Sequence, residues 1–254
     1  MKEQRHILTA LVFMVAVTVG NVQVQAQEAA SSPVEAYYCS LRDGQSMDDL
    51  MQVASRFSKW ADKNAPDYSA WILTRAFVQG DQLPQMIWLG SNPTGASMGK
   101  TLDAYQKSGG DIADAFDKVI DCSAGHGLAT SVEINAPDGP PGDGVVMFSQ
   151  CSIADGSDWM KAVEAHKAFS GKMRSMGGKN SNWAFFPMLG GVATDFDYWA
   201  VSTFNNWTDY FTAYDLYTNG EGWKQAMETF KGVTNCNQRP PTVWNVNLVR
   251  EGAS

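Results

Sequence analysis

Two histidines and four cysteines beyond residue 26 are the side chains best suited to chemistry. His126 lies in the segment Ala124-Gly125-His126-Gly127, whose glycines predict a loop before a strand. No second histidine or carboxylate accompanies it at the spacing of metal ligands, so we expect a solvated residue and no metal centre. His166 lies on a predicted helix whose apolar face also contains Trp159, Ala162, Phe169 and Met173. A histidine breaks that pattern and is expected to be partly buried.

Polar residues within predicted strands form a second group of candidates. One strand, at 128–134, has Ala129, Ser131 and Glu133 on one face, and the strand at 242–249 has Val243, Asn245 and Asn247 at the corresponding positions. Alternate residues of a strand face opposite ways, so both sets are expected to face the interior of the molecule, and Arg75 of a strand at 71–77 is expected to join them. The predicted ligand-binding residues are therefore Arg75, Glu133, Asn245 and Asn247. A solvated sheet face without a pocket is the alternative.

Residues 1–26 have the pattern of a cleaved signal peptide. Lys2 and Arg5 precede an uncharged run at 7–20, and Val24-Gln25-Ala26 places small residues at the cleavage site. The run is shorter than the roughly 20 apolar residues that span a bilayer, which argues against a retained anchor. We therefore expect the mature chain to be soluble and periplasmic or secreted, without membrane insertion.

The charge of the mature chain bears on its partners. Without residues 1–26 it has 17 basic and 26 acidic residues, a net charge of minus nine, and no basic cluster. Binding to a phosphate backbone requires a basic surface that releases counterions. We therefore expect no nucleic-acid partner, and a small molecule is the expected ligand.

The chain repeats itself with an offset of about 112 residues. Cys39-Ser40-Leu41-Arg42-Asp43-Gly44 returns as Cys151-Ser152-Ile153-Ala154-Asp155-Gly156. Tryptophans recur as the pairs Trp71 with Trp183 and Trp88 with Trp199, which indicates shared packing rather than a ligand cage. Residues 136–144, rich in proline and glycine, predict a linker. The sequence thus divides into repeats at 34–135 and 145–254.

Each repeat is expected to follow the order β-α-β-β-α-β. The first has strands at 36–41, 68–78, 86–92 and 128–134, with helices from residue 47 onward and at 97–120, the second interrupted near Gly109-Gly110. The second has strands at 145–152, 183–189, 197–205 and 242–249 and helices at 158–173 and 209–230. The fold class is therefore α+β, two tandem ferredoxin-like units, each with a bare sheet face that the other can cover.

The four cysteines are even in number, which in an oxidising compartment indicates two disulfides. In the ferredoxin-like order the first and last strands are neighbours. Cys39 is therefore expected to pair with Cys122, and Cys151 with Cys236, although the sequence alone leaves three pairings open.

Tandem ferredoxin-like units with sheet faces to bury resemble the dimeric α+β barrel superfamily, which includes antibiotic-biosynthesis-type monooxygenases, chlorite dismutases and dye-decolourising peroxidases. The resemblance implies a pocket between sheet and helices or inside the barrel. In the haem enzymes of this group a helix of the second unit carries the proximal histidine, and His166 is similarly placed, so haem is the alternative to having no cofactor. The peroxidases have a Gly-x-x-Asp-Gly motif. This chain has Asp-Gly at Asp43 and at Asp155, but the first glycine of the motif is missing in both places.

The residues identify no catalytic set. We expect an exported soluble barrel protein that binds a small organic ligand. The alternatives are a cofactor-free monooxygenase or isomerase, a haem-dependent enzyme of the same barrel type, and a non-catalytic interaction module.

Overall fold

The computed structural model describes residues 31–78, 84–190 and 195–253. The expected signal peptide, residues 1–26, lies outside these ranges. Elements of the first repeat are β1 (Ser31–Leu41), α1 (Met47–Asn64), β2 (Ser69–Phe77), β3 (Met86–Ser91), α2 (Gly95–Ser108), α3 (Gly110–Asp117) and β4 (Ile120–Asn135). Elements of the second are β5 (Gly144–Ile153), α4 (Trp159–Ser175), β6 (Ser181–Gly190), β7 (Tyr198–Phe204), α5 (Trp207–Thr218), α6 (Gly222–Phe230), β8 (Thr234–Asn235) and β9 (Thr242–Arg250).

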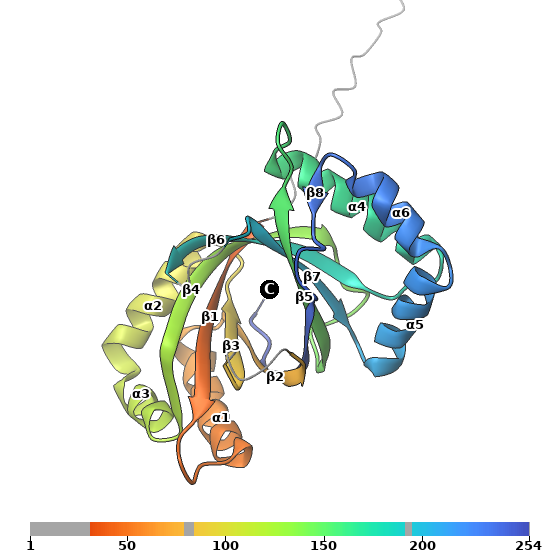
Figure 1. Cartoon of the computed structure of the whole chain (residues 1–254). Helices are drawn as coiled ribbons and strands as arrows, with labels where there is room; N and C mark the ends of the chain where they lie inside the picture. The colour runs from red at the N-terminus through yellow and green to blue at the C-terminus, as the bar shows by residue number, and fades with distance from the viewer. Residues whose placement is uncertain (1–30, 79–83, 191–194, 254) are drawn as a thin grey trace, which may run out of the picture.

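Eight strands form one closed antiparallel barrel. The order is β7-β6-β4-β1-β3-β2-β9-β5, and β5 pairs again with β7 to close the ring. Each repeat contributes four neighbouring strands in the ferredoxin-like order, and the pairs β4–β6 and β2–β9 join the repeats. Figure 1 shows α1, α2 and α3 on one flank of the barrel and α4, α5 and α6 on the other. The expected fold class is confirmed.

Local sequence explains where the helices begin. Ser46 and Asp49 form a reciprocal capping box at the start of α1, and Thr94 and Ser97 form one at the start of α2. Helix α2 ends at Gly109, as the glycine pair predicts. Helices α4 and α5 also begin within two residues of the expected positions, 158 and 209.

Three expected elements are wrong in extent. The first strand begins at Ser31 rather than at residue 36. The helix expected at 209–230 is two helices, because the chain breaks at Gly220: a side chain there would lie 2.7 Å from the carbonyl oxygen of Leu216. Glu221 then adopts a positive φ of 65° before α6 begins. The last strand of the first repeat begins at Ile120 rather than near residue 128, so it includes Cys122 and His126.

The core has separate layers on the two sides of the sheet. Between the first-repeat helices and the sheet lie Leu50, Phe57, Ile72 and Trp88. Inside the barrel lies a second apolar cluster, which includes Leu73, Ile87, Val146, Val201 and Trp244. Close-packed interiors of this kind hold a fold in one arrangement. The barrel interior is therefore largely filled by side chains of both repeats.

Both expected disulfides are present. Cys39 is bonded to Cys122 and Cys151 to Cys236, one in each repeat. Each links the first strand of its repeat to the chain that leaves the last helix. No helix among the described residues is long and apolar enough to cross a membrane.

Candidate functional site

The two repeats differ in how the space between helices and sheet is filled. The disulfides and the strand registers fix an offset of 112 residues between equivalent positions: Cys39 is opposite Met86 as Cys151 is opposite Tyr198. In the first repeat, Phe57 packs against Trp60, Tyr68, Trp88 and Phe116. Aromatic rings therefore pack the space between the first-repeat helices and the sheet.

The second repeat keeps only part of this cluster. Phe169, which corresponds to Phe57, contacts Tyr217 and Phe230. The other large residues are exchanged for smaller or polar ones: Tyr37 for Ser149, Trp60 for Lys172, Tyr68 for Asn180 and Trp88 for Ala200. The loss of these rings leaves a space that nothing else fills.

That space is a cavity of about 920 Å³ between the sheet and helices α4, α5 and α6. Its helix side is apolar and aromatic, with Phe169, Met173, Tyr210, Tyr214 and Phe230. Its sheet side carries small and uncharged polar residues, among them Ser149, Asn182, Ala200, Ser202 and Thr234. Ligand sites in proteins have this size and this combination of apolar walls with a few polar groups.

The polar residues of the sheet side are ordered by hydrogen bonds. Asn182 Oδ1 accepts from Ser170 Oγ at 2.7 Å and from Asn180 Nδ2, while Asn182 Nδ2 donates to Ser202 Oγ at 2.7 Å. Because both ends of the Asn182 amide are engaged, its orientation is fixed. The cavity therefore has ordered polar groups on its sheet side and aromatic side chains on its helix side.

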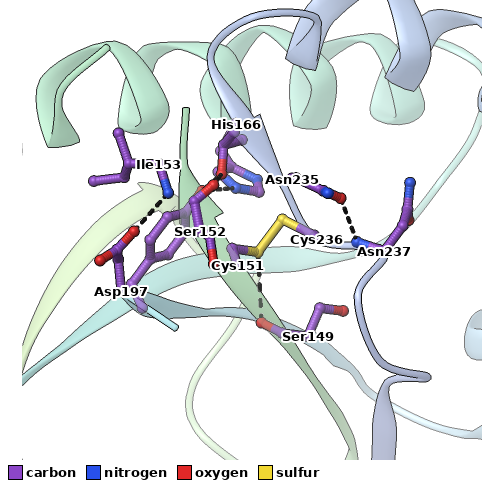
Figure 2. The surroundings of a disulfide bond; sticks show 11 residues. Ser149, Cys151, Ser152, Ile153, His166, Asp197, Asn235, Cys236 and Asn237 are labelled. Atoms are coloured by element: carbon purple, nitrogen blue, oxygen red, sulfur yellow. Dashed lines mark hydrogen bonds between the residues drawn. A yellow bond between two sulfur atoms is a disulfide. The ribbon is translucent and has the colours of Figure 1, made fainter. Parts of the chain in front are cut away.

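His166 lies at the edge of the cavity next to the Cys151–Cys236 disulfide (Figure 2). Its Nε2 lies 2.9 Å from the hydroxyl of Tyr198, which lies 2.8 Å from Thr234 Oγ1. Burial lowers the pKa of His166 to about 4 and raises the pKa of Tyr198 to about 12. Both side chains are therefore uncharged at neutral pH.

The chain of hydrogen bonds favours one tautomer of His166. Thr234 Oγ1 donates its proton to the carbonyl oxygen of Ser152 at 3.0 Å, so it accepts from Tyr198. In this arrangement Tyr198 has only its lone pairs to offer His166, and Nε2 donates. The proton of the neutral ring is thus on Nε2, and Nδ1 carries the lone pair.

The predicted ligand-binding residues do not come together. Arg75 is paired across the strands with Trp244, and Glu133 with Trp183, so both face the barrel interior as expected. Arg75 Nε donates to the carbonyl oxygen of Pro84 at 2.8 Å.

Asn245 and Asn247 face the other way, and their expected inward orientation is wrong. Their cross-strand partners, Val145 and Ile72, belong to the layers beneath the helices. The inward residues of β9 are Trp244 and Val246. The predicted inward face of β9 comes from aligning it with β4. That alignment gives the wrong face because apolar residues occur on both faces of β9.

His126 is not in a loop. It lies within β4, its ring is stacked on Tyr37 with centroids 3.7 Å apart, and its Nε2 lies 2.9 Å from Glu35 Oε2. Glu35 is buried and also accepts from the Tyr68 hydroxyl at 2.7 Å. This cluster belongs to the filled repeat, since Trp88 donates to Tyr68 at 3.1 Å.

The second repeat does not fit haem. Nε2 of His166 is held by Tyr198. The other ring nitrogen, Nδ1, is adjacent to the carbon that joins the ring to the backbone, so a group as large as haem is sterically hindered there. Phe230 lies against the ring with centroids 4.7 Å apart. No haem chemistry follows from this arrangement.

A sequence signal for the cavity exists, but it is clear only when the two repeats are compared at the correct offset of 112 residues. Pairing Trp88 with Trp199 uses an offset of 111 and suggests shared packing. In the structure Trp88 lies beneath the helices and Trp199 inside the barrel, so that pairing is wrong. Trp88 corresponds to Ala200, so a large ring in the first repeat is replaced by a methyl group in the second. We call the second repeat, which contains the cavity, the hollow repeat.

No family model and no curated protein matches the sequence. Solved structures do match. A protein from Lactobacillus acidophilus provisionally assigned as a monooxygenase is 10% identical, with a TM-score of 0.52 over 89% of this chain and 99% of that one. A chlorite dismutase variant from Candidatus Nitrospira defluvii is 8% identical, with a TM-score of 0.50 over 87% and 93%. At such low identity the likeness establishes the dimeric α+β barrel fold alone.

Proposed function

We propose that this protein, a dimeric α+β barrel with one hollow repeat, binds a small organic molecule between the sheet and helices of its second repeat. The observation that carries the proposal is the cavity of about 920 Å³ at positions where the first repeat is filled with aromatic rings. An unfilled space of this size forgoes packing energy, which a bound ligand would restore.

The lining indicates the chemistry of the ligand. Lys231 is the charged side chain among the lining residues of the described chain, and it is exposed. An ionised ligand group buried deep in the cavity would find no opposite charge there, which is strongly unfavourable. The proposed ligand is therefore neutral, with an apolar or aromatic body and one polar edge toward Asn182 and Ser202.

We further propose that the mature protein is exported, to the periplasm or outside the cell. The features that support export are the signal-like residues 1–26 and the two disulfides, which persist in oxidising compartments.

A cofactor-free enzyme is the second candidate. The observation that favours it is the neutral His166 at the edge of the cavity, whose Nδ1 lone pair could accept a proton from a bound substrate. For this candidate, His166→Ala would abolish turnover while leaving ligand affinity nearly unchanged.

The binding proposal is tested with N-phenyl-1-naphthylamine, a neutral probe whose fluorescence rises in apolar surroundings. We expect one saturable site in the wild type and loss of that site in Ala200→Trp, which puts the ring of Trp88 at the equivalent position. Ala136→Trp, the same change at an exposed residue, is the control and should bind as the wild type does. Equal binding by all three proteins would refute the proposal.

A further inference from the structure

Three potential metal ligands converge beside the cavity. The sulfur atoms of Cys151 and Cys236 and a ring nitrogen of His166 all lie within 4.8 Å of one another. Figure 2 shows His166 projecting from α4 toward the disulfide. His166 and Cys236 line the cavity, whereas Cys151 is completely buried. The three residues come from α4, β5 and the segment after β8, and Cys236 is 85 residues from Cys151 in the sequence.

The first repeat has the same disulfide without the nitrogen ligand. Ala54 occupies the position of His166, and Met86 occupies that of Tyr198. Cys39 and Cys122 are nonetheless bonded. A structural disulfide at this place therefore needs no histidine, and the histidine of the second repeat calls for another explanation.

The orientation of His166 suits metal binding. Tyr198 and Thr234 hold Nε2–H, which leaves the Nδ1 lone pair available. Ligating histidines commonly donate the proton of the other nitrogen to such an outer partner, which orients the ring and strengthens the ligand. The hydroxyl of Tyr198 would take that role here.

We propose that reduction of the Cys151–Cys236 disulfide creates a Cys2His site for a thiophilic ion such as Zn²⁺. A dithiol supplies two electrons and two protons, becomes a disulfide itself and leaves Cys151 and Cys236 as thiols. The ion then displaces one proton from each thiol and binds both thiolates and His166 Nδ1. Three protein ligands leave a fourth position, on the side of the cavity, as in zinc sites that bind water or substrate.

The proposal goes beyond ligand binding and does not depend on it. The test uses the mature chain reduced anaerobically with a phosphine, which does not compete as a thiol, and titrated with Cd²⁺, whose bonds to thiolates absorb in the ultraviolet. Cys39→Ser/Cys122→Ser retains only the second-repeat pair, and Cys151→Ser/Cys236→Ser retains only the first-repeat pair. We expect the second-repeat pair to bind one Cd²⁺ at least about tenfold more tightly, the size of effect that even an outer partner of a ligand can have.

His166→Ala in the variant that retains the second-repeat pair should remove this advantage. Equal affinities of the two pairs, or no effect of His166→Ala, would overturn the proposal. In case the cysteine variants do not fold, the wild-type chain labelled with ¹⁵N-histidine provides a separate measurement. Zn²⁺ should shift the Nδ1 signal of His166 after reduction and leave His126 unchanged. An unshifted His166 signal at saturating Zn²⁺ would also overturn it.

Discussion

At the level of single residues, the cavity depends on which side chains the second repeat lacks. Trp88 is 8% exposed, its indole nitrogen donates to Tyr68, and its ring meets Phe57 and Phe116 edge to face. At the equivalent position Ala200 supplies one methyl group. The same backbone fold can therefore have either a packed layer of side chains or a cavity between its sheet and its helices.

Trp88→Ala should show how much the packed layer contributes. Removing a buried tryptophan should lower the free energy of unfolding by about 3–5 kcal/mol, because the surrounding rings collapse only in part. Trp159→Ala, at a half-exposed tryptophan, should lower it by less than about 1 kcal/mol. Urea unfolding with the disulfides intact measures both. Equal effects would mean that the first repeat is not tightly packed.

Glu35 is the second residue whose effect can be predicted. It is 4% exposed and holds both the Tyr68 hydroxyl and the His126 ring. Glu35→Ala should lower the free energy of unfolding by about 1–3 kcal/mol, because the buried Tyr68 hydroxyl is left without its acceptor. Glu35→Gln, which keeps an oxygen, should lie between it and the wild type.

The control for this pair is Glu164→Ala, at an exposed glutamate that pairs with Lys167 one turn away, and it should have little effect. If Glu35→Ala and Glu164→Ala were equally stable in urea unfolding, the buried cluster would contribute nothing to stability.

The sequence predicts residue positions well where one face of a strand is uniformly apolar, and poorly elsewhere. Glu133 faces inward as expected, because β4 alternates clearly. Asn247 does not, because β9 has apolar residues on the barrel side and beneath the helices. A shift of one residue reverses such an assignment, and only the pairing partners reveal which face is which.

At the level of elements, α5 is the weakly held part of the second repeat. It has no buried residue, whereas its counterpart α2 buries Met98 and Thr101. Phe211 and Tyr214 are 48% and 54% exposed. Both helices have a side-chain N-cap, Thr94 and Asn206, so capping does not explain the difference. The cavity beneath α5 explains why this helix is less buried than α2.

Amide hydrogen exchange should therefore distinguish these two helices. Without ligand, we expect α5 to exchange faster than α2, because few packed side chains oppose its local opening. N-phenyl-1-naphthylamine should slow exchange in α5 and leave α2 unchanged. Exchange measured on proteolytic peptides tests this directly. Equal protection of α2 and α5 in the free protein would contradict the proposed loose packing.

Element order and type could be predicted from the repeat, since every expected strand and helix exists. Breaks within helices were harder. Two adjoining glycines predict the break at Gly109. The break at Gly220 is not predicted, although Asn219 and Gly220 are typical helix-ending residues. The early start of β4 follows from its pairing with β1, a long-range contact that local sequence does not show.

At the level of the whole molecule, each repeat covers the bare sheet face of the other. Leu73 and Ile87 of the first repeat meet Val146 and Val201 of the second inside the barrel. The barrel interior is thus packed, and the cavity lies outside it, under the second-repeat helices. The resemblance to barrel proteins is compatible with a pocket inside the barrel or between sheet and helices. The structure shows the cavity between sheet and helices.

The most direct test of this account is a crystal of the protein soaked with a neutral bromonaphthalene. We predict one strong anomalous bromine peak between the sheet and helices α4–α6, near Ala200 and Phe169. The same soak of Ala200→Trp should show no peak there. A peak inside the barrel, or a second-repeat space that stays empty at saturating compound, would contradict the claim that the hollow repeat is the ligand site.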